Sequence, residues 1–310
     1  ADNAMLKYGL SFLKTPYVAH TLEVNDEEKL VVNFDEVDCT TFVEYVLALS
    51  LSPVKDGAID KADYARNLQN IRYRDGKIDG YTSRLHYIAD WVNNGVRHGF
   101  MEDVAAANSP DTVRLSLDFM STHAKAYKHL ESSPANIGKM EEIEKSLSGQ
   151  VFHYIPKNKL PDNGFGWIKN GDIIAITTNI PGLDVVHLGL AYYERGVLKL
   201  LHASSTRKMV VITQRPLAQM LKNNKKFTGI RVLRMKKDGQ QAESLMPKRS
   251  FCAFSAARSI PSSDHSSKVS NPRSFICGKI SSKLRPGKRQ TVLSEKRMDK
   301  PSFAHLVKSG

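Results

Sequence analysis

Apolar and polar positions follow two different periodicities along the chain, and the change falls near residue 171. Residues 29–34 (Lys-Leu-Val-Val-Asn-Phe) predict a short strand. The segment at 39–50 is apolar on nearly all sides, which indicates a buried helix. Apolar residues at helical spacing predict helices over residues 2–13, 39–50, 61–74, 83–97, 112–130 and 139–147.

Beyond residue 171 the pattern is that of β-structure. Glu194–Arg195–Gly196 predicts a tight turn between two strands, and residues 216–221 predict a short helix. The predicted strands are residues 172–178, 185–193, 197–203, 209–213 and 229–235. Helices followed by antiparallel strands are typical of an α+β fold.

The charge divides the chain into two unequal regions. The formal net charge is +13 over 310 residues, but residues 241–310 hold 14 basic and 4 acidic residues, a net charge of +10. We expect a domain at 1–240, with a helical part at 1–150 and a sheet part at 151–240. The Ser-rich segment 241–310 shows no periodicity and predicts a disordered tail. It is either a basic anchor for a polyanion or a non-native extension. We favour the second interpretation because aromatic residues are sparse, so no nucleic-acid partner is expected.

The cysteine count and hydropathy exclude several classes of protein. No run approaches the roughly 20 apolar residues of a membrane span, and no signal-peptide pattern opens the chain at Ala1. The cysteines are Cys39, Cys252 and Cys277, an odd number without a CxxC pair. This excludes a disulfide framework and disfavours a structural zinc site.

Cys39 is the first candidate for chemistry. Asp38 precedes it as a predicted N-cap, so the thiol lies in the first turn of the buried helix. Free backbone N–H groups and the helix dipole at that position favour a thiolate. We therefore expect Cys39 to be more acidic than a free thiol and to need a base nearby.

Two histidines interrupt consecutive apolar strands and are candidates for that base. His187 lies in the strand at 185–193 and His202 in the strand at 197–203. The turn between the strands makes them a hairpin, so the histidines can meet on one face. One imidazole would accept a proton and the other would orient it. An alternative is a metal site in which Cys39, His187 and His202 bind zinc, although no fourth ligand is evident.

Together these features resemble the bacterial N-acetylmuramoyl-L-alanine amidase-like family, within the NlpC-type superfamily of papain-like cell-wall peptidases. The resemblance runs from about residue 5 to residue 236. The matching segments are 15–19 (Thr-Pro-Tyr-Val-Ala), 29–33 (Lys-Leu-Val-Val-Asn), 38–44 (Asp-Cys-Thr-Thr-Phe-Val-Glu), 71–74 (Ile-Arg-Tyr-Arg), 81–87 (Tyr-Thr-Ser-Arg-Leu-His-Tyr), 154–157 (Tyr-Ile-Pro-Lys), 171–177 (Gly-Asp-Ile-Ile-Ala-Ile-Thr) and 201–205 (Leu-His-Ala-Ser-Ser).

The resemblance implies a papain-like core in which the Cys-bearing helix packs on an antiparallel sheet, with an extra helical insertion. It also implies a Cys39–His187–His202 triad that hydrolyses an amide bond of peptidoglycan or a muropeptide, without cofactor or metal. We expect a monomer that acts in the periplasm or elsewhere outside the cytoplasm. The family tends to have Gly where this chain has His20, so we expect that side chain to crowd the loop near Tyr17.

Four further residues are candidates for substrate contacts. Tyr17 can lend its hydroxyl to the reacting centre, and the Arg84 fork can bind a carboxylate. Ser83 lies beside Arg84 in a matching segment, and Asp38 is a substrate contact or a helix cap.

The leading function is a cell-wall amidase that cuts between the muramic lactyl group and L-alanine. A γ-D-glutamyl endopeptidase of stem peptides would use the same triad. A non-catalytic binder of peptidoglycan or another polyanion is the third possibility.

Overall fold

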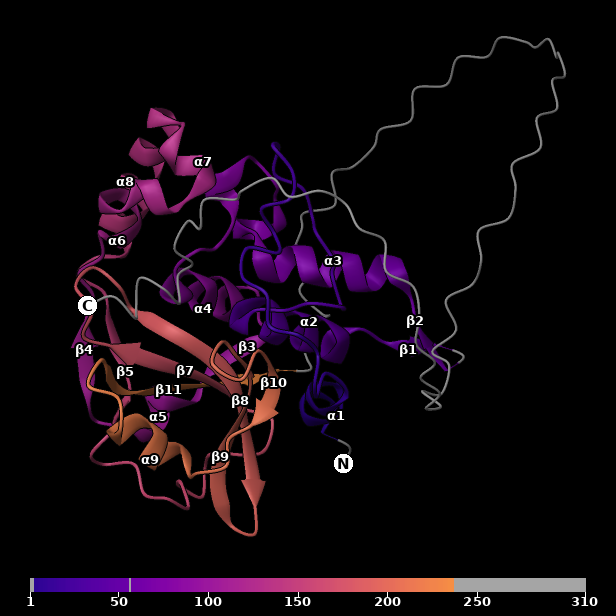
Figure 1. Ribbon diagram of the computed structural model, residues 1–310, viewed down its shortest axis with the longest axis vertical. Coiled ribbons are helices and arrows are strands. Elements are labelled where there is room, and N and C mark those ends of the chain that lie inside the picture. The colour runs from indigo at the N-terminus through magenta and orange to yellow at the C-terminus, as the bar shows by residue number, and fades with distance from the viewer. Residues whose placement is uncertain (1–2, 56, 237–310) are drawn as a thin grey trace, which may run out of the picture.

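A mixed sheet-and-helix domain makes up the described part of the chain, residues 3–55 and 57–236 of a computed structural model (Figure 1). Both the boundary expected at residue 240 and the tail at 241–310 lie outside the described residues. None of the helices in the described ranges has the length and apolar character that crossing a membrane requires.

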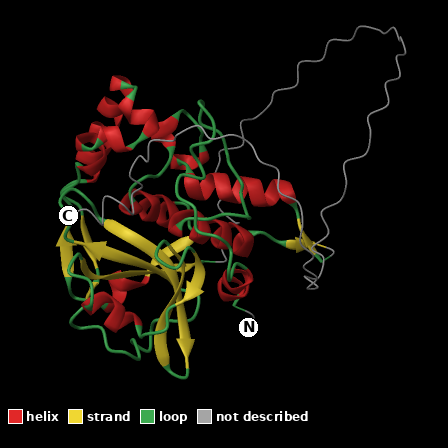
Figure 2. Ribbon diagram, viewed as in Figure 1, coloured by secondary structure: helices red, strands yellow, loops and turns green. Residues whose placement is uncertain are grey.

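Most helices lie in the first 150 residues, as the periodicity predicts. Figure 2 shows the helices in red and the strands in yellow. The helices are α1 (Ala4–Ser11), α2 (Cys39–Leu51), α3 (Lys61–Arg72), α4 (Ile88–Arg97), α5 (Val104–Asn108), α6 (Phe119–Thr122), α7 (Lys128–Glu131), α8 (Pro134–Leu147) and α9 (Leu217–Lys222), with 3-10 turns η1 (Arg74–Gly76), η2 (Tyr81–Ser83) and η3 (Ala124–Ala126).

The main sheet has the strand order β10-β9-β8-β7-β11-β3, every neighbouring pair is antiparallel, and β6 also pairs with β11. The strands are β1 (Val54–Lys55), β2 (Ala58–Ile59), β3 (Met101–Asp103), β4 (Thr112–Arg114), β5 (Val151–His153), β6 (Ile155–Pro156), β7 (Ile173–Thr178), β8 (Val185–Glu194), β9 (Val197–Ser204), β10 (Met209–Ile212) and β11 (Phe227–Met235). The α+β prediction is confirmed.

Helices cover both faces of this sheet. Helices α1 to α4 lie over one face, where α2 contacts β8 and β9 (Figure 1). Residues 42–43 and 45–48 of α2 are fully buried in this layer. On the other face α9 packs through Leu217 and Leu221. Helices α6 to α8 form a separate group with a small core of its own.

The predicted strand at residues 29–34 is wrong. The segment is not part of any strand in the described residues. Side chains of α2 and α3 bind two of its backbone groups instead. Val31 O accepts a hydrogen bond from Arg72 Nη1 (2.6 Å), and Asn33 N donates to the Tyr45 hydroxyl (3.0 Å). A β-rich sequence therefore serves as a strap across two helices.

Two predicted helices are also corrected. The helix expected at 83–97 begins only at Ile88, because Arg84 bridges to Tyr73 in an extended conformation. Residues 112–130 are not one helix but β4 followed by short helical turns. Strand β4 pairs with β5 across the chain, and this pairing outweighs local helix propensity.

Candidate active site

A cleft of about 420 Å³ opens where the start of α2 meets β8. Cys39 and His187 both line it, with Tyr17 and Asp38 beside them. The loop before α2, the start of α4, the α6–α8 segment and the α9–β11 loop supply the other walls. Residues distant in sequence therefore share one cavity.

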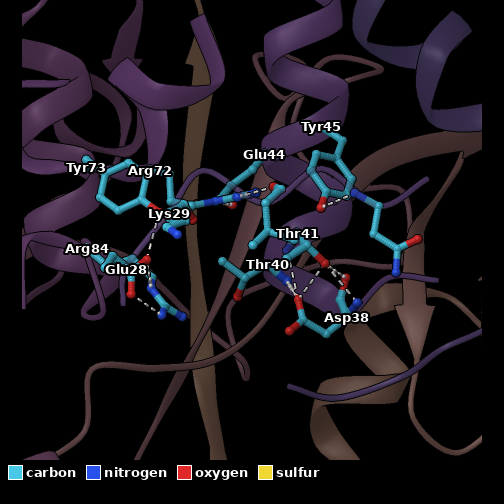
Figure 3. Close-up of polar contacts among 12 residues, drawn as sticks. Glu28, Lys29, Asp38, Thr40, Thr41, Glu44, Tyr45, Arg72, Tyr73 and Arg84 are labelled. Carbon is cyan, nitrogen blue, oxygen red and sulfur yellow. Dashed lines mark hydrogen bonds and ion pairs between the residues drawn. The ribbon is translucent and has the colours of Figure 1, made fainter. Parts of the chain in front are cut away.

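Asp38 caps the helix that carries Cys39. Its Oδ1 accepts hydrogen bonds from the backbone N–H groups of Thr40 (3.0 Å) and Thr41 (2.8 Å), and its own N–H donates to Thr41 Oγ1 (2.9 Å) (Figure 3). This is a capping box. Asp38 thus fixes where α2 begins, and the half-buried Cys39 occupies the first helical position.

The predicted acidity of Cys39 is wrong. Burial in the cleft, and then the Asp38 carboxylate, raise the pKa of the Cys39 thiol to about 12. The backbone amide of Leu188 and the Thr40 hydroxyl lower that pKa by less. The helix start stabilises a thiolate less than expected because the Asp38 carboxylate takes the N–H groups of Thr40 and Thr41. The backbone N–H of Cys39 itself lowers the pKa of the thiol only slightly. At neutral pH the resting group is a thiol.

The two histidines meet as the hairpin predicts. His187 Nε2 lies 2.6 Å from His202 Nδ1, and the rings are nearly perpendicular at 87°. Pairing of β8 with β9 runs from Glu194 and Val197 at the turn to Leu190 and Leu201, and both histidines lie beyond it. One hydrogen bond joins the two rings. If His187 Nε2 carries the proton and donates it, then Nδ1 of the neutral His187 ring has no proton and can accept one.

Both imidazoles are neutral at pH 7. Burial lowers the pKa of His187 to about 4, and burial together with His187 lowers the pKa of His202 well below its usual value. His202 is buried and does not line the cleft. The site therefore holds a neutral thiol, a neutral imidazole at the cleft wall and a second imidazole bonded to it.

Tyr17 is held next to the cysteine by backbone bonds on two sides. Tyr17 N donates to Lys208 O (2.9 Å), and Val18 N donates to Val37 O (3.1 Å), one residue before Asp38. Burial raises the pKa of the Tyr17 hydroxyl, and Cys39 and Asp38 raise it further. Tyr17 therefore remains protonated and keeps a donor in the cleft.

Arg84 lines the same cleft, but carboxylates occupy its guanidinium. Nε and Nη2 donate to the two carboxylate oxygens of Glu28 (3.1 and 2.7 Å; Figure 3). Nη1 donates to Glu23 Oε1 (2.9 Å). Ser83 does not line the cleft, because its Oγ donates to Gly80 O (2.7 Å) and accepts from Asp79 N (3.0 Å). The structure places both residues in local networks, without the free fork that a substrate carboxylate would need.

Several cleft residues escaped the sequence analysis. His86 bonds Tyr81 O (2.9 Å), and burial lowers its pKa to about 3. Tyr127, just before α7, presents a buried hydroxyl without a hydrogen-bond partner in the described chain. No local pattern marks Tyr127, since only the tertiary fold brings the α6–α8 segment to the cleft.

The zinc interpretation gains no support from the geometry. His187 and His202 use Nε2 and Nδ1 on each other. Within residues 3–55 and 57–236, no group of three or more His, Cys, Asp or Glu side chains is placed to hold a metal ion. The same side chains suit proton transfer better than metal binding.

The comparisons with known proteins agree with this picture. A model of the N-acetylmuramoyl-L-alanine amidase-like family matches residues 7–230. The chain belongs to that family. It is 63% identical to an N-acetylmuramoyl-L-alanine amidase of Bacteroides uniformis, over 76% of this chain and 100% of that one, with a TM-score of 0.75. A search of curated proteins returned no match.

Two other solved structures share the fold of this amidase-like chain. A Bacteroides fragilis protein with a provisional xylanase name is 61% identical over 74% of this chain and 100% of its own, with a TM-score of 0.73. A Legionella pneumophila protein is 21% identical over 75% and 88%, with a TM-score of 0.58, which is evidence for the fold alone. Family membership supports a cell-wall amidase with peptidoglycan as the substrate class.

Proposed function

We propose that this chain is a cysteine-dependent N-acetylmuramoyl-L-alanine amidase with a papain-like arrangement of Cys39, His187 and His202. The observation that carries the proposal is the 2.6 Å bond between the two histidines beside the cleft that Cys39 also lines. Cys39 is the nucleophile, His187 the general base and acid, and His202 the residue that orients His187.

The attack begins from neutral partners. As Cys39 Sγ bonds to the lactyl carbonyl carbon of the muramic acid, its proton passes to His187 Nδ1. The imidazolium then gives this proton to the nitrogen of L-alanine as the C–N bond breaks. A water molecule hydrolyses the resulting thioester, returns the proton to Cys39 and releases the lactyl acid. The depressed pKa of His187 makes its imidazolium a strong acid toward the leaving amine.

The negative charge that develops on the carbonyl oxygen during the attack requires hydrogen-bond donors to stabilise it. The backbone N–H of Cys39 is one candidate, because N–H groups at the start of a helix have no partner within it. The Tyr17 hydroxyl is a second candidate, since it stays protonated near Cys39. Asp38 acts through the helix start, and Arg84 acts through Glu23 and Glu28 rather than on the substrate.

A glycosidase fits the cleft less well, although one relative carries a xylanase name. Glycoside hydrolysis requires two carboxyl groups free to act on the sugar. The acidic residues that line the cleft are Glu23, Asp38 and Glu44, and all three are engaged. Asp38 caps α2, Glu44 binds Arg72 (2.7 Å), and Glu23 binds Arg84 (2.9 Å).

Product analysis tests the proposal. The wild-type protein should convert a disaccharide peptide into free disaccharide and intact peptide, and Cys39→Ala should convert none. Release of a dipeptide instead would identify γ-D-glutamyl endopeptidase activity, which the same three residues can catalyse. Unchanged function in Cys39→Ala would favour the non-catalytic binder. Because the proposed substrate lies outside the cytoplasmic membrane, we place the enzyme in the periplasm or another extracytoplasmic space.

A further inference from the structure

Left-handed backbone at residues other than glycine is rare, and one such residue lies on the cleft. In the described part of the chain, His20 has φ +63° and lines the cleft with an exposed side chain. The remaining residues of this kind do not line the cleft: they are Lys14, Asp75, Arg195 and Lys208.

The fold accounts for the left-handed residue at two of these positions, Arg195 and Asp75. Arg195 and Gly196, with φ of +52° and +79°, form the tight turn of the β8–β9 hairpin. Asp75 uses its carboxylate to bind Arg97 (2.6 Å) and His98 (3.1 Å). His20 O accepts a hydrogen bond from Glu23 N (3.1 Å), so His20 is the first residue of a turn over residues 20–23.

The fold does not explain the imidazole of His20. Glycine adopts this conformation without the steric cost of a Cβ atom and would serve the turn better. Among the described residues, none forms a hydrogen bond, ion pair or ring contact with the His20 side chain. A residue in left-handed backbone whose side chain contacts no other described residue and faces the cleft has the character of a functional residue.

We propose that His20 contacts the substrate and sets its affinity, an inference that rests on the proposed amidase function. His20 is three residues beyond Tyr17, and both line the cleft with Cys39. Its exposed ring carries two nitrogens that can take part in hydrogen bonds. The partner is a hydrogen-bonding group of the muropeptide near the scissile amide, such as a hydroxyl or an amide. A chain with Gly at this position lacks the contact.

The experiment compares three variants of the full chain on a defined disaccharide peptide. His20→Gly removes the ring and the strain together, and His20→Asn keeps a polar group that tolerates left-handed backbone. Arg195→Gly is the matched control, because it relieves the same strain in an exposed turn away from the cleft. The readouts are kcat, KM and the melting temperature.

We expect His20→Gly to raise KM about 3- to 10-fold and to leave kcat within about twofold of the wild-type value. This is the result expected when a contact of equal strength in the bound substrate and the transition state is lost. Its melting temperature should stay level or rise by up to about 3 °C. His20→Asn should have an intermediate KM, and Arg195→Gly should leave KM unchanged. A purely structural His20 cannot combine weaker binding with unchanged or greater stability.

Two results would overturn the inference, and they are distinguishable. In the first result, the wild-type protein turns over the muropeptide and His20→Gly has the same KM. This result would contradict a role of His20 in binding and would leave the proposed amidase function standing. Wild-type protein that turns over no muropeptide removes the proposed function itself, and the His20 contact with it.

Discussion

The cleft contains two polar clusters that look equally promising in the sequence and differ in the structure. At one end Cys39 and His187 keep a thiol and an imidazole nitrogen without a strong partner, with His202 behind them. At the other end Arg84 is saturated by Glu23 and Glu28. We call these the open cluster and the closed cluster. Chemistry requires groups that can still form bonds, whereas a fully paired network stabilises the fold.

The largest expected effect breaks the closed cluster. Arg84→Met leaves the Glu28 carboxylate without its cation, and the Glu28 side chain is only 5% exposed. We expect a loss of about 3–5 kcal/mol in the free energy of unfolding, measured by urea denaturation. Lys128→Ala is the control, because the exposed Lys128–Asp26 pair should contribute less than about 1 kcal/mol. Equal losses in both variants would remove the distinction between buried and exposed pairs.

The open cluster should make the fold sensitive to acid. The pKa of His187 is about 4 in the folded protein and near 6.5 when unfolded, so the unfolded state binds more protons between these values. The stability associated with neutral His187 is present above pH 6.5 and is lost as pH falls toward 4, by up to about 3 kcal/mol. Denaturation at pH 7 and pH 4 should show a smaller difference for His187→Gln than for wild type. An identical pH dependence would contradict the buried neutral imidazole.

Loss of the second histidine should affect the rate more than binding. His202→Ala removes the bond that orients His187, so we expect kcat to fall about 10- to 100-fold while KM changes little. His202→Asn places a carbonyl oxygen near the former Nδ1 position and should recover part of that rate. Steady-state kinetics on a muropeptide measure both, and a change in KM alone would argue for a structural role.

The smallest effect concerns the hydroxyl of Tyr17. Tyr17→Phe keeps the ring and removes the donor proposed for the carbonyl oxygen. We expect kcat to fall about 3- to 10-fold, within the range of one hydrogen bond, without a change in melting temperature. An unchanged kcat would contradict this role of Tyr17 and would leave the backbone N–H of Cys39 as the donor to the carbonyl oxygen.

The sequence predicted those parts of the molecule that depend on local pattern. The buried helix at Cys39, the hairpin at Arg195–Gly196 and the meeting of His187 with His202 follow from periodicity and turn chemistry. The sheet strands after residue 171 were also found, with small differences at their ends.

Features that depend on distant partners were missed. The strap at residues 29–34 looks like a strand until Arg72 and Tyr45 bind its backbone. The acidity expected for Cys39 considered the helix alone and omitted burial and the Asp38 carboxylate. Arg84 looked free because its partners, Glu23 and Glu28, lie more than fifty residues away in the chain.

The most direct test of the open cluster is the alkylation of Cys39 as a function of pH. Iodoacetamide is applied to the full chain between pH 5 and pH 10, and peptide mass mapping separates Cys39 from Cys252 and Cys277. Because the cleft holds a neutral thiol, the rate at Cys39 should keep rising beyond pH 9, above the usual thiol pKa of about 8.5. A rate that is already at its plateau near pH 6 would indicate a preformed thiolate–imidazolium pair and contradict the account.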